Sequence, residues 1–275
     1  MKHQSDTPIR AVGVIAEYNP FHNGHAYQLK KARELSGANY CIAAISGDFV
    51  QRGGPAVFDK YTRTAMALES GADLVVELPP IFASSSAEDF ASCGVALLDA
   101  LGVVSHLCFG SESGNLEELS SVADLLADES EEYQQVLRQH LKDGYPFPQA
   151  RAAAFSFCSP KTDPELLSQP NNTLGIEYLK AIKKKNIPVT PVTIKRMGSS
   201  YHEAVISSDQ PMASATAIRA VLESRTVDDF KESNLLLASQ IPPAALNLAR
   251  TRLPLTADDF SALLSFRSLE LDRQG

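Results

Sequence analysis

Short apolar runs alternate with amphipathic segments along the first 110 residues of the chain. The apolar runs are typical of buried strands, which we predict at residues 10–16, 40–45, 73–78 and 106–109. Between them, apolar residues recur at helical spacing, which predicts helices at residues 24–35, 59–70 and 87–101. Strands that alternate with helices form βαβ units, so the pattern predicts a parallel sheet covered by helices on both faces.

The pattern becomes helical after residue 110. Residues 115–142 read as one acidic helix, whose charges are most simply interpreted as a solvated face. Residues 171–173 are predicted to cap a further helix that runs to about Lys185. Residues 188–194 are rich in β-branched side chains and predict a fifth strand.

From residue 213 onward the sequence predicts helices alone, at 227–238, 243–251 and 257–269. We therefore expect an α/β domain over residues 8–224 with a helical insertion at about 115–185. A helical segment follows over residues 225–275.

Composition and charge narrow the class of protein. The chain has 275 residues, 44% of them hydrophobic, and a net charge of -8, which is typical of a globular protein and argues against general coating of nucleic acid. A local basic patch stays compatible with that charge. The four cysteines lack metal-type spacing and are interpreted as free thiols in a reducing compartment. The polar N-terminus and the interruption at Glu17 fit neither a signal peptide nor a membrane span, so we expect a cytoplasmic protein without a membrane partner.

A histidine motif follows the first predicted strand directly. Residues 19–25 read NPFHNGH, between that strand and the next predicted helix. Gly24 lets the backbone approach a ligand, and the helix directs its free N–H groups and its positive dipole end at an anion. The imidazoles of His22 and His25 add directional donors. A turn would not require two histidines, so the motif predicts a phosphate-binding site.

A second candidate phosphate site lies almost 200 residues downstream. Ser214 and Thr216 stand where a helix would begin, and Arg219 falls in its first turns. Hydroxyl groups, free N–H groups and a guanidinium on one side of a helix start favour phosphate binding. Such a pattern alone is often an ordinary helix cap. It indicates a phosphate site here because the chain also carries the histidine motif.

Together, the two motifs resemble the signature of the nucleotidylyltransferase superfamily. The resemblance implies a Rossmann-like fold with a five-stranded parallel sheet and, here, a helical C-terminal extension. It also implies that His22 and His25 are catalytic, contacting the nucleotide and stabilising charge at the α-phosphorus. Ser214, Thr216 and the catalytic Arg219 would hold the β and γ phosphates that leave as pyrophosphate.

Longer motifs are similar to those of the tRNA(Met) cytidine acetate ligase family. They are EYNPFHNGH at 17–25, SGDFVQRG at 46–53, GADLVVELP at 71–79, FGSE at 109–112, PNNTLGIEY at 170–178 and IKR at 194–196. The resemblance implies that acetate and ATP give acetyl-adenylate and pyrophosphate. The acetyl group then passes to the exocyclic amine of the wobble cytidine of elongator tRNA(Met).

The resemblance also implies a set of site residues. Contacts with ATP would come from Val14, Ile15, Ala16, Glu17, Tyr18, Asn19, Pro20, Phe21, His22, Asn23, Gly24, His25, Ala26, Tyr27, Gly110, either Asn171 or Asn172, and Arg196. The loop after the second strand offers Ser46, Gly47, Asp48 and Arg52 as candidates for contact with substrate. Mg²⁺ is expected to be carried on the triphosphate, without a metal site built by the protein.

A basic stretch is the candidate surface for tRNA phosphates. It comprises Lys180, Lys183, Lys184, Lys185 and Lys195 beside Arg196, with no acidic residue between Lys180 and Met197. A solvated helix face is an equally good interpretation. Members of the family usually continue well beyond the catalytic module, so residues 225–275 are interpreted as an incomplete tRNA-binding part.

Two other functions stay open at this point. The chain could be a nucleotidylyltransferase or a carboxylate-adenylating ligase that acts on a small molecule. It could also be a nucleotide-binding or RNA-binding module without turnover, although the two intact phosphate motifs argue against this. The oligomeric state does not follow from the sequence.

Overall fold

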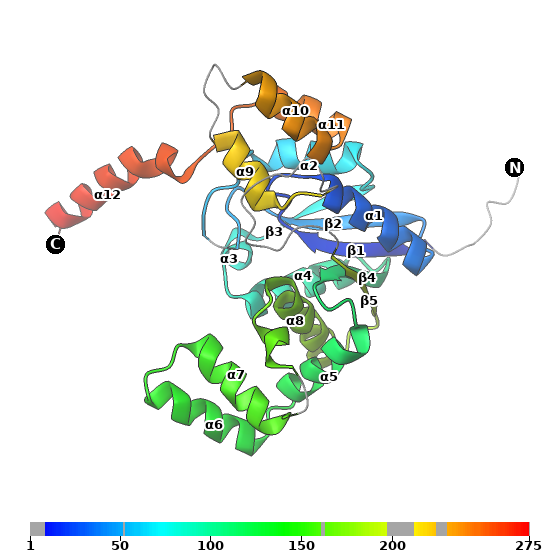
Figure 1. The fold of residues 1–275 in the computed structure, drawn as a ribbon, viewed down its shortest axis with the longest axis vertical. Helices are drawn as coiled ribbons and strands as arrows, with labels where there is room; N and C mark the ends of the chain where they lie inside the picture. Colours follow the sequence, from blue (N-terminus) through cyan, green and yellow to red (C-terminus); the bar gives the residue numbers. More distant parts are fainter. Residues whose placement is uncertain (1–8, 52, 161–162, 197–211, 224–229, 275) are drawn as a thin grey trace, which may run out of the picture.

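A five-stranded parallel sheet forms the centre of the protein in a computed structural model (Figure 1). The structure describes residues 9–51, 53–160, 163–196, 212–223 and 230–274. The strands are β1 (Ala11–Ala16), β2 (Tyr40–Ser46), β3 (Leu74–Leu78), β4 (Val104–Ser111) and β5 (Thr190–Lys195), in the spatial order β3-β2-β1-β4-β5. This arrangement confirms the predicted α/β class and its five strands. Because β1 pairs with both β2 and β4, the chain order reverses at β1, where ligands bind in open sheets of this type.

Helices cover both faces of the sheet (Figure 1). One face carries α4 (Ala87–Ala100), α5 (Leu116–Ala127) and α8 (Pro170–Lys185). The other carries α1 (Asn23–Ser36), α2 (Lys60–Glu69), α9 (Ala215–Glu223), α10 (Phe230–Gln240) and α11 (Pro243–Arg250). Alternation along β1 feeds both cores, since Ala11 and Ile15 pack on the α4 side and Val12 and Val14 on the α1 side.

The segment between β4 and β5 differs from its prediction in two places. Residues 115–142 form two helices, α5 and α6 (Glu131–Lys142), because the Ser130 hydroxyl accepts a hydrogen bond from the Tyr133 N–H and starts a new helix. The pair continues into α7 (Phe147–Cys158) and the short η1 (Pro164–Leu167). The helix predicted to be capped by residues 171–173 starts earlier, because Pro170 occupies its first position and places Asn171 and Asn172 inside the first turn.

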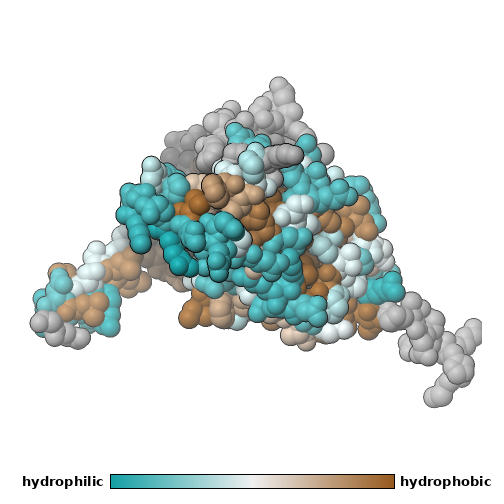
Figure 2. Space-filling view, turned by 90° about the horizontal axis from the view of Figure 1, so that it is seen from below, coloured by the Kyte–Doolittle hydropathy of each residue, from teal (hydrophilic) through white to brown (hydrophobic). Residues whose placement is uncertain are grey.

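Smaller elements complete the chain. The short α3 (Pro80–Ala83) follows β3, and η2 (Ala257–Phe260) leads into α12 (Ser261–Gln274). Figure 1 shows α12 projecting from the body, and Figure 2 shows hydrophobic and hydrophilic residues side by side on it. The predicted boundary near residue 224 lies outside the described residues, so the division into domains stays a prediction. All four cysteines are free, and Cys41 and Cys108 are buried.

Candidate active site

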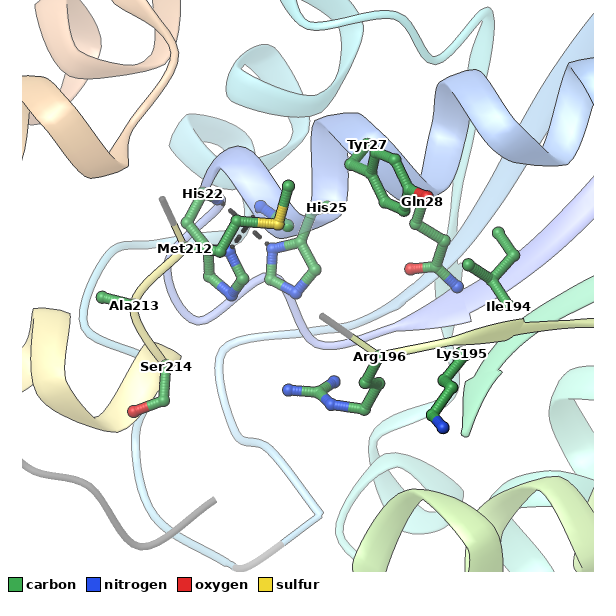
Figure 3. A pocket seen from close by; sticks show the side chains of 12 residues that line it. His22, His25, Tyr27, Gln28, Ile194, Lys195, Arg196, Met212, Ala213 and Ser214 are labelled. Atoms are coloured by element: carbon green, nitrogen blue, oxygen red, sulfur yellow. Dashed lines mark hydrogen bonds between the residues drawn. The ribbon is translucent and has the colours of Figure 1, made fainter. Parts of the chain in front are cut away.

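A cavity of about 530 Å³ opens at the carboxyl ends of β1 and β4, where the strand order reverses. Segments from across the chain line it: the turn after β1, the loop after β2, the ends of β4 and β5, and the first turns of α1, α4, α8 and α9. A smaller recess of about 60 Å³ lies beside it and adds Lys195 and Met212 (Figure 3). Segments that are distant in sequence therefore meet at the edge where the motifs were expected to converge.

The histidine motif forms a reciprocal cap on α1. His22 is the residue before the helix, and its Nδ1 accepts a hydrogen bond from the Gly24 N–H at 3.0 Å. In return, the Nδ1 of His25 accepts one from the His22 N–H at 3.3 Å, and the two rings stack with centroids 3.8 Å apart. A Cβ at position 24 would lie 2.8 Å from the His22 ring, so glycine is required for ring packing as well as for access.

These hydrogen bonds determine which ring nitrogen carries the proton. Each Nδ1 accepts a backbone N–H, so in the neutral imidazole the proton sits on Nε2. Burial, and then the nearby Arg196 and Arg219, lower the pKa of His22 to about 3. Burial, His22 and Arg196 also lower the pKa of His25. At neutral pH both residues are uncharged donors through Nε2, and Figure 3 shows their rings and the Arg196 guanidinium around the same space.

We expect the protein to lose stability between pH 7 and pH 5, in part through His22. Its imidazole takes up a proton near pH 6.5 in the unfolded chain but only near 3 in the folded state, so the unfolded state binds more protons as the pH falls. The contribution lost at pH 5 is about 2 kcal/mol. Urea unfolding measures the free energy of unfolding at pH 7 and at pH 5. The difference between these two values should be smaller for His22→Asn than for the wild type, and asparagine can still cap α1. An unchanged difference would contradict the assignment.

The Ser214, Thr216 and Arg219 motif lines the same cavity. Ser214 is buried at the start of α9, where its hydroxyl accepts a hydrogen bond from the Ala217 N–H at 3.1 Å. Arg219 donates to the Asn19 carbonyl at 2.7 Å and to the Thr216 hydroxyl at 3.1 Å. The arginine therefore ties α9 to the turn that carries the histidines, and the structure brings the two predicted phosphate sites together.

The two candidate asparagines have different surroundings. Asn172 is buried, its amide group donates to the Gln169 side chain, and its carbonyl oxygen accepts from the Ser113 N–H. Asn171 lines the cavity, and its Oδ1 accepts from Arg196 at 3.3 Å. Of the two asparagines, Asn171 is thus the one that lines the cavity.

Glu112 orients Asn171 and was not singled out by sequence. Its carboxylate accepts from the Asn171 side-chain amide at 2.6 Å and from the Asn172 N–H at 2.7 Å. A carboxylate at the N-terminus of α8 also interacts favourably with the helix dipole. The FGSE motif that contains Glu112 was a signal that sequence reasoning could have used.

The remaining nucleotide candidates divide between the cavity and the core. Residues 15–19 and Gly110 line the cavity, and Gly24 and Tyr27 line the recess. Val14 and Phe21 are fully buried in the hydrophobic core, so their side chains serve packing. Pro20, Asn23 and Ala26 belong to neither lining, and Asn23 donates to the Ser239 carbonyl at 2.8 Å.

Three residues of the predicted substrate loop, Ser46, Gly47 and Asp48, lie outside the cavity lining. Ser46 and Gly47 are buried outside the lining, and the exposed Asp48 accepts from the Lys60 N–H at 2.9 Å. The same loop reaches the cavity through Val50, Gln51, Gly54 and Pro55 instead. Arg52 lies outside the described residues.

A buried arginine that sequence reasoning missed fixes the backbone at the ends of two strands beside the site. Arg63 on α2 is fully buried and donates to the carbonyls of Phe58, Glu17, Ser46 and Gly47. It therefore fastens the end of β1 to the end of β2. The signal was its position in the apolar stripe of α2, which Arg63 shares with Met66 and Ala67 at helical spacing.

The predicted lysine patch does not form one surface. Lys180 is buried, and its ammonium lies 2.7 Å from Glu177 and 3.0 Å from Glu88, which makes it part of an ion-pair network between helices. Lys183 pairs with Asp124 and Asp128. Since α8 advances about 1.5 Å per residue, Lys184 and Lys185 lie roughly 20 Å from Asn171, whereas Lys195 stands at the recess.

The donor set of the cavity suits a polyanion. Its described lining includes two guanidinium groups, two neutral imidazoles, three aliphatic hydroxyl groups and two phenol hydroxyl groups against a single carboxylate, Glu17. In the described part of the chain, histidine, cysteine and acidic side chains form no group of three that could hold a metal ion. Within the same ranges, none of the helices is both long and apolar enough to span a membrane.

Comparisons with known proteins agree with this geometry. The sequence profile of the HIGH nucleotidyl transferase family matches residues 9–274. The tRNA(Met) cytidine acetate ligase of Syntrophomonas wolfei is 47% identical over 214 residues, which cover 77% of this chain and 51% of that protein. The enzyme of the same name from Caldicellulosiruptor saccharolyticus is 40% identical over 266 residues, covering 95% and 63% respectively.

A solved structure is similar over nearly the whole chain. It is that of Thermotoga maritima TmcAL bound with alpha-thio ATP, with a TM-score of 0.82, 38% identity, and coverage of 94% of this chain and 60% of that one. The chain spans 51–63% of the length of the curated relatives that it matches.

Proposed function

The chain belongs to the HIGH nucleotidyl transferase family, and from this we propose that it is an ATP-dependent acetate ligase that acetylates the wobble cytidine of elongator tRNA(Met). One observation supports the proposal above the others. Two phosphate-binding motifs that are almost 200 residues apart line a single cavity, with Arg219 joining them. Relatives of 39–47% identity carry the name of this activity.

In the first step, a carboxylate oxygen of acetate attacks the α-phosphorus of ATP. A bond forms between that oxygen and phosphorus, and the bond to the bridging oxygen breaks, so that pyrophosphate leaves. Acetate is already an anion at neutral pH, so this step needs no general base. It needs positioning and relief of charge repulsion.

The residues of the cavity suit those needs. We propose that the Nε2–H groups of His22 and His25 stabilise charge at the α-phosphate, and that Ser214, Thr216 and Arg219 hold the leaving pyrophosphate. Arg196 and Asn171, which are hydrogen-bonded to each other in the same lining, are proposed to contact the rest of the nucleotide. Mg²⁺ bound to the phosphates would neutralise part of their charge, and we assign it no protein ligand.

In the second step, the cytidine amine attacks the acetyl carbon and AMP leaves. A wobble base in an anticodon loop is accessible because it is not held in a duplex. Lys195 at the recess is the candidate nearest the cavity for an RNA phosphate, and exposed Lys184 and Lys185 are more distant ones. The two substrates, ATP and tRNA, imply a cytoplasmic enzyme.

We expect pyrophosphate exchange into ATP to be stimulated by acetate. The assay offers acetate, longer carboxylates and mononucleotides separately, since each class would select a different function. Stimulation by a mononucleotide alone would contradict the proposal and favour a small-molecule nucleotidylyltransferase. Mass analysis of tRNA(Met) incubated with the protein, ATP and acetate should then reveal acetylcytidine. The matched control is a tRNA without cytidine at the wobble position.

A further inference from the structure

We propose that Glu17 is the catalytic residue that accepts the proton lost by the amine during acetyl transfer. This inference rests on the proposed function, because it concerns the second step of that reaction. The amine nitrogen forms a bond to the acetyl carbon, and the bond from that carbon to the adenylate oxygen breaks. The nitrogen's proton passes to a carboxylate oxygen of Glu17, and AMP departs as a phosphate monoester anion.

The two histidines cannot take this proton on their cavity side. Each Nδ1 already accepts a backbone hydrogen bond, so each Nε2 carries a hydrogen and acts as a donor. Taking up a further proton would require a charged imidazole, and burial beside Arg196 and Arg219 disfavours that charge at His22. The histidines therefore suit the first step and leave the second without a base.

Glu17 is the single carboxylate among the described residues that line the cavity and its recess. Arg196 and Arg219 are permanent cations and have no lone pair to offer. Tyr18 and Tyr178 are buried, which raises the pKa of each phenol and keeps its proton in place. Glu17 is therefore the one carboxylate acceptor that the described ionisable groups of the lining offer.

Glu17 is also held firmly at the position where two strands end. Its Oε1 accepts a hydrogen bond from the Gln51 N–H at 3.2 Å, and its backbone carbonyl accepts one from the buried Arg63 at 2.5 Å. The next residue, Tyr18, has a φ of 50°, a left-handed conformation that side chains seldom adopt. Backbone strain of this kind persists where surrounding contacts enforce it, as at catalytic positions.

The test separates the two steps in the Glu17→Gln variant. Glutamine keeps the shape and an oxygen that can accept the Gln51 N–H, but it does not accept a proton. Because Glu17 also lines the cavity proposed for ATP, acetate-dependent pyrophosphate exchange is expected to fall in this variant, but by a much smaller factor than acetyl transfer. Acetyl transfer to tRNA(Met), or to cytidine at high concentration, should fall by about 100-fold or more, the usual contribution of a general base. Glu17→Asp should recover part of the transfer rate.

Glu131→Gln on α6 is a charge-matched control, because Glu131 is exposed and outside the cavity lining. It should leave both steps unchanged, and melting temperatures should show that all three variants are folded. Glu17→Gln overturns the inference if transfer survives, or if exchange falls as much as transfer. Wild-type exchange without transfer to either acceptor also overturns it. Absence of acetate-dependent exchange in the wild type would instead refute the proposed function.

Discussion

Replacing His25 by alanine is expected to reduce acetate-dependent pyrophosphate exchange by about 100- to 1000-fold, the usual effect of removing a preorganised donor from a developing charge. The neutral His25 presents its Nε2–H to the cavity, and alanine offers no donor there. The loss should appear mainly in kcat, because charge at the α-phosphorus grows on the way to the transition state.

Stability should change little in the same variant. His25→Ala removes one capping hydrogen bond, the one from the His22 N–H, which is worth about 1 kcal/mol. We therefore expect the melting temperature to fall by only a few degrees. His106→Ala is the control for exchange, because His106 contacts the Ser105 hydroxyl outside the cavity lining. A large stability loss in His25→Ala would identify His25 as a packing residue instead.

Replacing Glu177 by alanine is expected to destabilise the fold by about 3–5 kcal/mol, as removal of one partner from a buried ion pair does. The Glu177 side chain is 1% exposed and lies 2.5 Å from Arg151 and 2.7 Å from Lys180. Without Glu177, Arg151 and Lys180 lose the buried negative charge that they share. Urea unfolding should report the change as a lower midpoint with an unchanged slope.

Lys183→Ala is the matched control for that network. Its ammonium on α8 lies 2.7 Å from Asp128 at the end of α5, but its side chain is 40% exposed, so its loss should cost under about 1 kcal/mol. Equal effects of Glu177→Ala and Lys183→Ala would contradict the buried network. They would also return Lys180 to the candidates for contact with RNA.

The architecture followed from the sequence because its signals are local. Apolar runs separated by helical patterns predicted five parallel strands, and all five are present, with every end within two residues of its predicted position. Residues that follow strand ends collect at one edge of a parallel sheet, which is why the histidine motif and Gly110 could be placed at one cavity in advance. The prediction of one helix over residues 115–142 was wrong, because Ser130 caps a new helix, α6, after the end of α5.

The direction of individual side chains depended on tertiary structure. Neighbouring residues on a helix point about 100° apart. Asn171 reaches the cavity whereas Asn172 is buried for that reason, and only the position of α8 over β4 decides between them. Likewise, Lys180 faces Glu88 on α4, and Lys183 faces Asp124 on α5. The first two lysines of the run are therefore held in ion pairs between helices.

The sequence by itself determined the parallel α/β sheet, its strand ends and the two phosphate motifs, because these depend on spacing along the chain. Only the tertiary structure decided that Arg219 joins the two motifs, that Arg63 ties β1 to β2, and that Glu17 is the carboxylate in the described cavity lining. The physical reason is that burial and hydrogen-bond partners are properties of what packs against a residue. Those partners come from segments that the chain brings together only when it folds.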